Sequence, residues 1–207
     1  FIMKNFTKLI FAFLFTISQI FSAQAQDLVL QGIIDFTVPS GGSDGKAIHV
    51  KAINAIPDLS VYGIGVANNG GGTDGEEYSF DAISVSAGDD ILVAREIAEM
   101  TAYLDACATE FEHVLLANTG ISQNGDDAIE LYLNGIVIET FGDIDTDGTG
   151  EAWEYMDSWA YRTGIGTVTP PSPTLISECG DFDPGPNTSW PYVLTAVTAS
   201  QGSISQG

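Results

Sequence analysis

Alternating hydrophobic and polar side chains are the dominant pattern of this chain, and they predict β-strands. The alternation is clearest in Lys46–Ile53 and Asp127–Leu133, where successive side chains would point to opposite faces. Lys46–Ile53 is expected to be half buried, with one face toward the core. The predicted strands are residues 27–36 with a kink at Gly32, then 46–53, 61–68, 77–80, 83–85, 91–95, 111–117, 127–133, 136–141, 153–162 and 190–197.

One segment has the period of a helix instead. In Glu96–Cys107, apolar residues recur at spacings of three and four, which predicts a short amphipathic helix covering the core. Asn134-Gly135 separates two strand patterns and is a strong hairpin signal, because both residue types tolerate positive φ. The loop Asn68–Gly75 is expected to be a simple glycine-rich turn. Many short strands, one helix and frequent turns predict an all-β fold, a β-sandwich.

The N-terminal residues have the order of a secretory signal peptide. Lys4 and Lys8 are followed by the apolar run Leu9–Phe21 and by Ala23-Gln24-Ala25, a small-x-small cleavage site. The apolar run is too short to span a bilayer comfortably. We therefore expect residues 1–25 to be removed, the mature chain to be secreted or held at the cell surface, and no membrane span to remain.

Net charge limits the partners of the mature chain. The full sequence has 6 Lys and Arg against 28 Asp and Glu, and two of the cations leave with the signal, so its charge falls from −22 to −24. Such a surface repels phosphate backbones and anionic lipid heads, which disfavours direct nucleic-acid binding. The cations that remain are Lys46, Lys51, Arg95 and Arg162.

The acidic loop after the predicted hairpin is the best candidate site. Its spacing fits a twelve-residue calcium loop, in which Gly148 allows the sharp turn. Aspartates would supply single oxygens, a threonine its carbonyl, and Glu154 both oxygens. An alternative is a loop whose carboxylates cap their own backbone. The candidate calcium ligands are Asp143, Asp145, Asp147, Thr149, Glu151 and Glu154.

The sequence gives only weak signals for other metal sites or for catalysis. Asp126, Asp127 and Glu130 form a second acidic group, which we interpret as a turn entering a strand. His49 and His113 have no Cys or His at ligand spacing, which argues against zinc. No serine has a nucleophile-elbow context and no phosphate-binding loop is present, so no catalytic residue is assigned.

A row of aromatic residues and a pair of cysteines each allow two interpretations. Trp153, Tyr155, Trp159 and Tyr161 would share a strand face, either as sandwich core or as an exposed carbohydrate-stacking platform. The only cysteines are Cys107 and Cys179, which form either a disulfide in an oxidising compartment or two separate thiols.

Two blocks of the chain resemble lamin-tail-like domains, in particular their bacterial, secreted branch. The first block is KAIHVKAINAIPDLSVYGIG, with its Asp-Leu-Ser turn, and the second is NGDDAIELYLNGIVIETFGDIDTDGTGEAWEYMDSWAYR. The resemblance covers residues 27–162, and it implies an immunoglobulin-like β-sandwich that serves as an accessory module on exported proteins. His49 departs from it, since the family tends to have Glu there.

The expected organisation is therefore a signal peptide at residues 1–25, a lamin-tail-like β-sandwich at 26–162, and a Pro/Gly-rich extension at 163–207 that could supply a closing strand. The expected function is a secreted, non-catalytic module that binds or tethers an extracellular or cell-surface ligand, with calcium as a candidate stabiliser. The alternative is an accessory domain of an extracellular hydrolase, such as a nuclease, whose catalytic part lies downstream. Fold resemblance alone assigns no activity.

Overall fold

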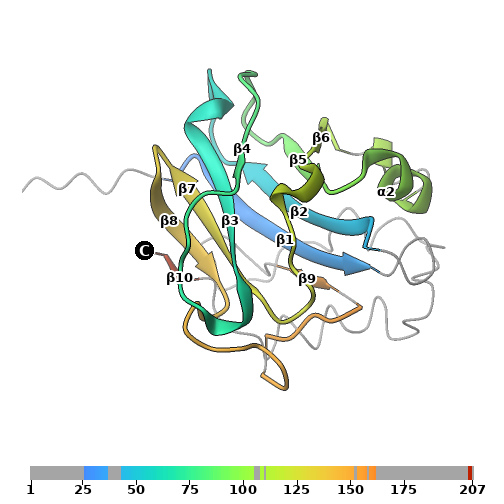
Figure 1. Ribbon diagram of the computed structural model, residues 1–207. Helices are drawn as coiled ribbons and strands as arrows, with labels where there is room; N and C mark the ends of the chain where they lie inside the picture. The colour runs from blue at the N-terminus through green and yellow to red at the C-terminus, as the bar shows by residue number, and fades with distance from the viewer. Residues whose placement is uncertain are drawn as a thin grey trace, which may run out of the picture.

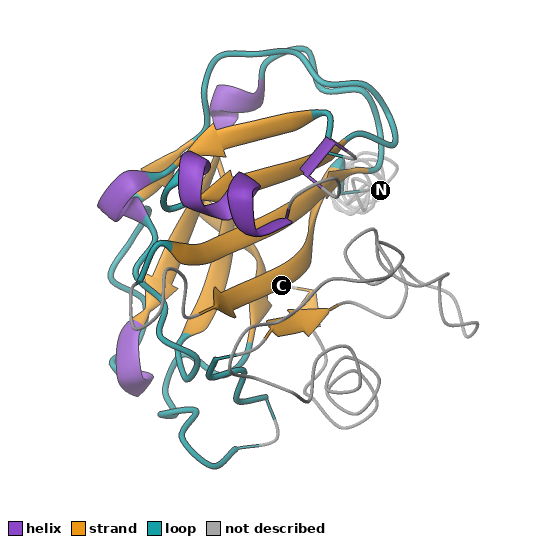
Figure 2. Cartoon of the chain, turned by 90° about the vertical axis from the view of Figure 1, so that its right-hand side faces the viewer, coloured by secondary structure: helices purple, strands orange, loops and turns teal. Residues whose placement is uncertain are grey.

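The computed structural model describes residues 26–36, 43–104, 108–109, 111–151, 153–157, 159–161 and 205–206. These residues form two β-sheets and one α-helix, which confirms the predicted β-sandwich (Figures 1 and 2). In spatial order, sheet I contains β6 (His113–Leu116), β5 (Asp90–Ala94), β2 (Gly45–Ala52), β1 (Leu28–Phe36) and β9 (Trp159–Tyr161). Sheet II contains β10 (Ser205–Gln206), β8 (Ile136–Phe141), β7 (Ala128–Leu133), β3 (Tyr62–Ala67) and β4 (Tyr78–Ser79).

The main core lies between the two sheets. Side chains that alternate along each central strand are fully buried there, among them Leu30 of β1, Val50 of β2, Ile64 of β3 and Leu131 of β7, each with 0% exposure. Burial of apolar side chains from both sheets is the main force that holds a sandwich together. The alternation seen in the sequence therefore has the structural meaning that was predicted for it.

The outer face of sheet I carries a second, smaller core. Helix α2 (Ile97–Leu104) packs there through Met100 and Leu104 against apolar residues of β1, β2 and β5 (Figure 2). The prediction that Lys46–Ile53 is half buried is therefore wrong. Both faces of β2 are covered, one by sheet II and the other by the cluster around α2.

Strand pairing is antiparallel except at one place. β5 and β6 are parallel, and α2 lies in the connection between them, as a parallel pair requires a crossover. The predicted hairpin is confirmed, because β7 and β8 pair around Asn134 and Gly135, which have φ of 52° and 74°. The predicted kink at Gly32 is also confirmed as a register shift between Leu30 and Gly32.

Some predicted elements differ from the structure. Residues 83–85 make a single isolated bridge, Ile56 to Val85, rather than a strand. The predicted strand 153–162 shortens to β9, because Trp153 and Tyr155 lie in a loop. The described part also contains the short 3₁₀ turns η1 (Leu59–Val61), η2 (Asn68–Gly70) and η4 (Asn118–Gly120).

Several predictions fall outside the described residues, namely the signal peptide, the strand 190–197, Cys107 and Cys179. Across the described ranges, no helix is long and apolar enough to cross a membrane.

Candidate functional site

Three loops meet at one end of sheet II, where β3 and β8 end and β7 begins (Figure 1). They are residues 68–77, 124–127 and 142–157, and we call them together the loop end. Antiparallel pairing places them side by side, because Ala67 pairs with Ala128 and Ile129 with Phe141. The loop end contains every predicted calcium ligand.

Backbone hydrogen bonds join the three loops to one another. Gly72 N donates to Ile144 O at 2.8 Å, which links the first loop to the third. Gly148 N donates to Asp126 O at 2.9 Å, and Tyr155 N donates to Gly125 O at 2.7 Å, which link the second loop to the third. Since each bond satisfies a backbone group that no strand partner serves, the loops form one connected unit.

The side chain of Asp127 extends this network. Its Oδ1 accepts a hydrogen bond from Asn69 N at 2.8 Å, and its Oδ2 accepts one from Asn124 N at 3.0 Å. The residue is 1% exposed, and burial raises the pKa of its carboxyl group despite these two donors. A single carboxylate thus joins the first and second loops.

Two aromatic side chains anchor the third loop in the core. Trp153 and Tyr155 are 7% and 1% exposed, and both pack edge-on against Phe141 of β8. Tyr155 Oη donates to Asp127 O at 3.0 Å, and burial raises its pKa well above the ordinary value. For these two residues the core interpretation is confirmed, and the carbohydrate-platform interpretation is wrong.

Glycines allow the close packing around Trp153. A Cβ at Gly148 would lie 2.5 Å from the Trp153 ring and 2.6 Å from Asp126 O. At Gly125, which has φ of 100°, a Cβ would collide with the backbone of Met156. The sequence interpretation of Gly148 as a turn residue therefore missed that its lack of a side chain leaves room for an indole ring.

The carboxylates of the acidic loop cap their own backbone, as the second sequence interpretation predicted. Asp143 Oδ1 accepts from Asp145 N at 3.0 Å, and Asp147 Oδ1 accepts from Thr149 N at 2.9 Å. Glu154 Oε2 accepts from Gly150 N at 3.0 Å. These contacts are Asx-type turns, extended by one glutamate.

The same residues do not gather around a common point. Thr149 uses its hydroxyl to donate to Asp126 Oδ2 at 3.0 Å, whereas the calcium loop would use its carbonyl. Glu151 is exposed, and its backbone N donates to Gly148 O. Within the described ranges, no group of three or more His, Cys, Asp or Glu side chains is placed to hold a metal. Calcium binding stays a prediction.

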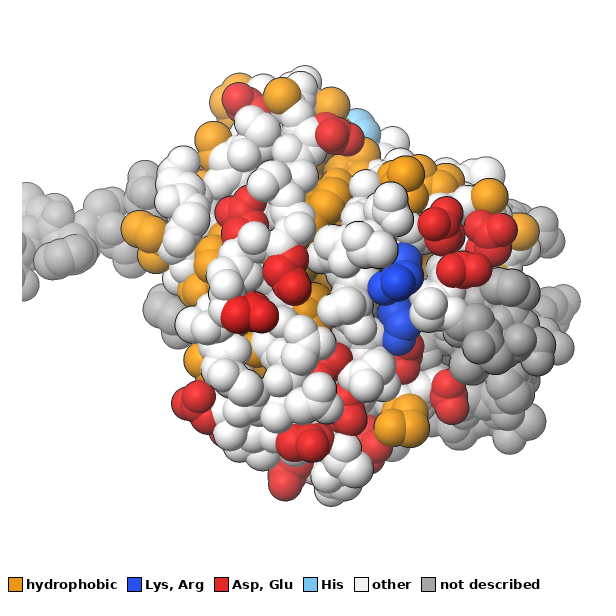
Figure 3. Space-filling model, viewed as in Figure 1, with side chains coloured by type: hydrophobic (Ala, Val, Ile, Leu, Met, Phe, Trp, Pro, Cys, Tyr) orange, Lys and Arg blue, Asp and Glu red, His pale blue; other side chains and the backbone are white. Residues whose placement is uncertain are grey.

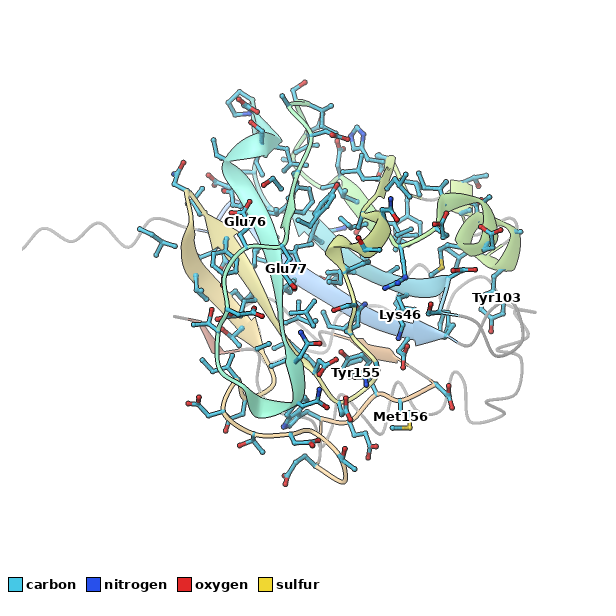
Figure 4. All side chains as sticks on the ribbon, in the orientation of Figure 1. Lys46, Glu76, Glu77, Tyr103, Tyr155 and Met156 are labelled. Atoms are coloured by element: carbon cyan, nitrogen blue, oxygen red, sulfur yellow. The ribbon has the colours of Figure 1, made fainter. Side chains whose placement is uncertain are left out.

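The second acidic group divides between two places. Asp126 and Asp127 belong to the loop end, as the turn interpretation predicted, whereas Glu130 lies on the outer face of sheet II. There, Glu130 Oε2 accepts from Tyr132 Oη at 2.9 Å, and Tyr132 Oη also contacts Thr73 Oγ1 at 2.9 Å. This face is covered by the first loop, whose Glu76 and Glu77 lie over β3 (Figure 4).

A buried ion pair next to the loop end was missed by sequence reasoning. Lys46 Nζ lies 2.7 Å from Asp35 Oδ1 and also donates to Gln123 O. Burial raises the pKa of Asp35, although Lys46 acts in the opposite direction. Lys46 and Tyr155 project toward the same end of the molecule (Figure 4). The signal that could have revealed this ion pair is the antiparallel register of β1 and β2, because it places Asp35 opposite Lys46.

A second polar cluster lies at the other side of sheet I, where β5 meets β6. His49 Nε2 contacts Asp90 Oδ1 at 2.8 Å, and Lys51 Nζ contacts Asp90 Oδ2 at 2.6 Å. We call residues 49, 51, 89–90 and 111–113 the β5–β6 corner. His49 and His113 each face a carboxylate there, and His113 Nε2 lies 3.4 Å from Asp89 Oδ2.

Most of the charged side chains on the face shown in Figure 3 are acidic. They are scattered over the upper part of this face and are more frequent along its lower margin, where the third loop runs, while a small basic patch lies to the right of its centre. Comparisons of the chain with protein-family models, with curated proteins and with solved structures gave no match.

Proposed function

We propose that this chain is an exported, non-catalytic binding module of the lamin-tail-like type, with an immunoglobulin-like sandwich as its scaffold. The loop end is the surface that meets an extracellular or cell-surface ligand. The observation that carries the proposal is that three separate loops are joined into one unit by hydrogen bonds between them. Binding residues are often carried by loops that a rigid scaffold positions.

The anchoring of the third loop supports this role. With Trp153 and Tyr155 fixed in the core, the residues between them and β8 are held at both ends. A loop that is ordered before binding loses less conformational entropy when a ligand arrives, and this favours affinity. A merely connecting loop needs no such anchors.

Exposed charge indicates the chemistry of the ligand. Asp143, Asp145 and Asp147 are all exposed at the loop end, while their contacts with neighbouring backbone hold the loop in shape. Carboxylates in this state attract cationic groups and steer them toward the surface. The proposed ligand is therefore a polymer or protein surface that carries amines.

The Asp58-Leu59-Ser60 turn supports the lamin-tail-like assignment. Asp58 Oδ1 accepts from Ser60 N at 3.0 Å and from Ser60 Oγ at 2.6 Å, which caps η1 just before β3. The turn that the resemblance is based on therefore has a defined structural task, which is to start the strand that ends at the loop end.

A charge-reversal pair tests the proposal. Binding of the purified chain to immobilised poly-L-lysine and to chitosan is compared with binding to cellulose and to heparin. We expect retention on the two cationic probes, and we expect Asp145→Lys to weaken it by about tenfold, since a favourable contact becomes a repulsive one. The measurement is the dissociation constant at low and physiological salt.

Asp81→Lys is the matched control, because Asp81 is exposed near Tyr62, at the opposite end of β3. It changes the net charge by the same amount and should leave binding within about twofold of wild type. Equal losses in the two variants would show that total charge, and not the loop end, determines retention. Absence of binding to every cationic probe would also contradict the proposal.

A further inference from the structure

We propose that the β5–β6 corner is an acid-sensitive latch, in which protonation of His49 releases β6 from the edge of sheet I. The three loops of the loop end stay joined when this happens. His49 is 2% exposed, and its ring lies between Asp90 of β5 and Phe111, which precedes β6. The latch therefore connects the central strand β2 to the outermost strand of the sheet.

The hydrogen bonds of His49 determine where a second proton must go. When Nε2 carries the proton and donates to Asp90 Oδ1 at 2.8 Å, Nδ1 is unprotonated and is the nitrogen that a second proton must occupy. Nδ1 is buried and has no hydrogen-bond partner among the described residues. Protonating it creates a buried N–H without an acceptor, which is costly unless water can reach it.

The segment before β6 is what keeps water away. The Phe111 ring meets the His49 ring edge-on, with centroids 5.1 Å apart, and Glu112 Oε2 accepts from Asp90 N at 2.8 Å. β6 itself is an edge strand of four residues whose only described strand partner is β5, and Leu116 is 50% exposed. A short edge strand is therefore the part of the enclosure that yields at least cost.

The charged groups around His49 come from three elements. Lys51 of β2 disfavours the imidazolium, whereas Asp90 of β5 and Glu112, next to β6, favour it. Burial is the largest influence, and it lowers the pKa of His49 below the ordinary value. Helix α2 contributes the apolar Met100 and Leu104 to the same face of sheet I, and its acidic residue Glu99 is exposed.

His113 acts against the release. Its Nε2 lies 3.4 Å from Asp89 Oδ2, so a positive charge on its ring strengthens the attraction between β6 and the turn before β5. The two histidines therefore have opposite effects on the same edge strand. Replacing His113 should therefore change the acid response of β6 in the opposite direction to replacing His49, which makes it a control.

Hydrogen exchange measured by mass spectrometry on the purified chain tests the latch. At about pH 5, compared with about pH 7.5 and after correction for intrinsic exchange rates, we expect protection of residues 111–116 to fall by about tenfold. Residues 142–151 of the loop end should keep their protection. Simultaneous loss in both segments would indicate global acid unfolding and overturn the proposal.

Two histidine variants complete the test. His49→Gln can still donate to Asp90 but does not titrate, so residues 111–116 should keep their protection at low pH. His113→Gln should release them more readily than wild type. An acid response in His49→Gln as large as that of wild type would overturn the proposal.

A measurement on the unaltered protein guards against a variant that fails to fold. In an NMR titration of wild type, the His49 ring should remain neutral for as long as the amides of β6 stay protected. It should take up its proton together with the loss of amide protection in β6. Protonation of His49 with β6 still fully protected would overturn the latch.

Discussion

The loop end and the β5–β6 corner each contain buried aspartates, but they differ in their supply of positive charge. At the corner, Asp90 contacts both His49 and Lys51. At the loop end, Asp126 and Asp127 are 6% and 1% exposed, and the nearby cation Lys46 is already paired with Asp35. The placement of cations, and not burial alone, therefore determines in which direction the pKa of a buried carboxyl group is shifted.

The pKa shifts follow that difference. Burial would raise the pKa of Asp90, but the hydrogen bonds and charges of His49 and Lys51 outweigh it and lower the pKa. Burial raises the pKa of Asp127 and of Asp35, because their donors and the single lysine do not outweigh it. Groups of the same type, similarly buried, are thus shifted in opposite directions.

Acid is therefore expected to act on the two regions with opposite sign. His49 and Asp90 have lowered pKa values when folded, so their contribution to stability is present above the unfolded values of 6.5 and 3.8, and it is lost as pH falls. Asp35 and Asp127 have raised pKa values, so their contribution is present below 3.8 and is lost as pH rises through the folded values. Mild acid should therefore loosen the corner but not the loop end.

Among the changes that should affect the loop end and the β5–β6 corner differently, Trp153→Ala is expected to have the largest effect. Removing this buried indole leaves a cavity next to Phe141 and Gly148, which should cost about 4 kcal/mol of unfolding free energy. Exchange protection should fall in residues 142–151 and persist in 111–116. Urea denaturation and hydrogen exchange measure the two parts of this prediction. Met156→Ala is the control, because Met156 is 48% exposed and its truncation should be nearly neutral.

The next largest effect is expected from removing Lys46, which tests how far this cation compensates for the burial of the Asp35 carboxylate. Lys46→Met leaves the Asp35 carboxylate buried without its partner, which should cost about 3 kcal/mol near neutral pH. Because the pKa of Asp35 then rises further, part of the loss should return as pH falls and the carboxyl group takes up a proton. Urea denaturation at about pH 7 and about pH 5 measures both effects.

The double variant Lys46→Met with Asp35→Leu is the control for that prediction. It removes both charges, so its stability should lie within about 1 kcal/mol of wild type and should not recover at low pH. A single variant as stable as wild type at neutral pH would show that the ion pair is not needed to hold β1 and β2 in register.

The smallest effect concerns added divalent cations. Since the carboxylates of the acidic loop already cap its backbone, calcium and magnesium at equal ionic strength should raise the melting temperature equally, by about 1–2 °C. Differential scanning calorimetry measures the shift. A larger shift with calcium that Asp145→Asn abolishes would instead establish the calcium loop predicted from the spacing.

The sequence predicted the sandwich well where local signals and the core agreed. Asn134-Gly135 specifies its turn through residue type alone, and the alternation of β7 matches the core side of sheet II. It predicted less well where a distant element decided burial. The outer face of β2 carries His49, which reads as polar and exposed, yet Phe111 and the neighbouring apolar cluster cover it.

The candidate site was predicted only in part, for a related reason. The acidic loop was recognised by its spacing, and its capping contacts are local, between residues two to four apart in sequence. The contacts that connect it to Gly72 and Gly125 depend on which strands are neighbours, which periodicity does not reveal. Trp153 shows the same limit, because its burial depends on space left at Gly148.

Two glycines of β3 have a consequence for how copies of this domain can coexist. Gly63 and Gly65 leave a trough on the outer face of sheet II, and the chain fills it with its own Glu76 and Gly75. That side consequently offers neighbouring molecules no flat, bare β-surface on which to stack. We therefore expect such domains to tolerate crowding, or arrangement in tandem, without forming fibres through this face.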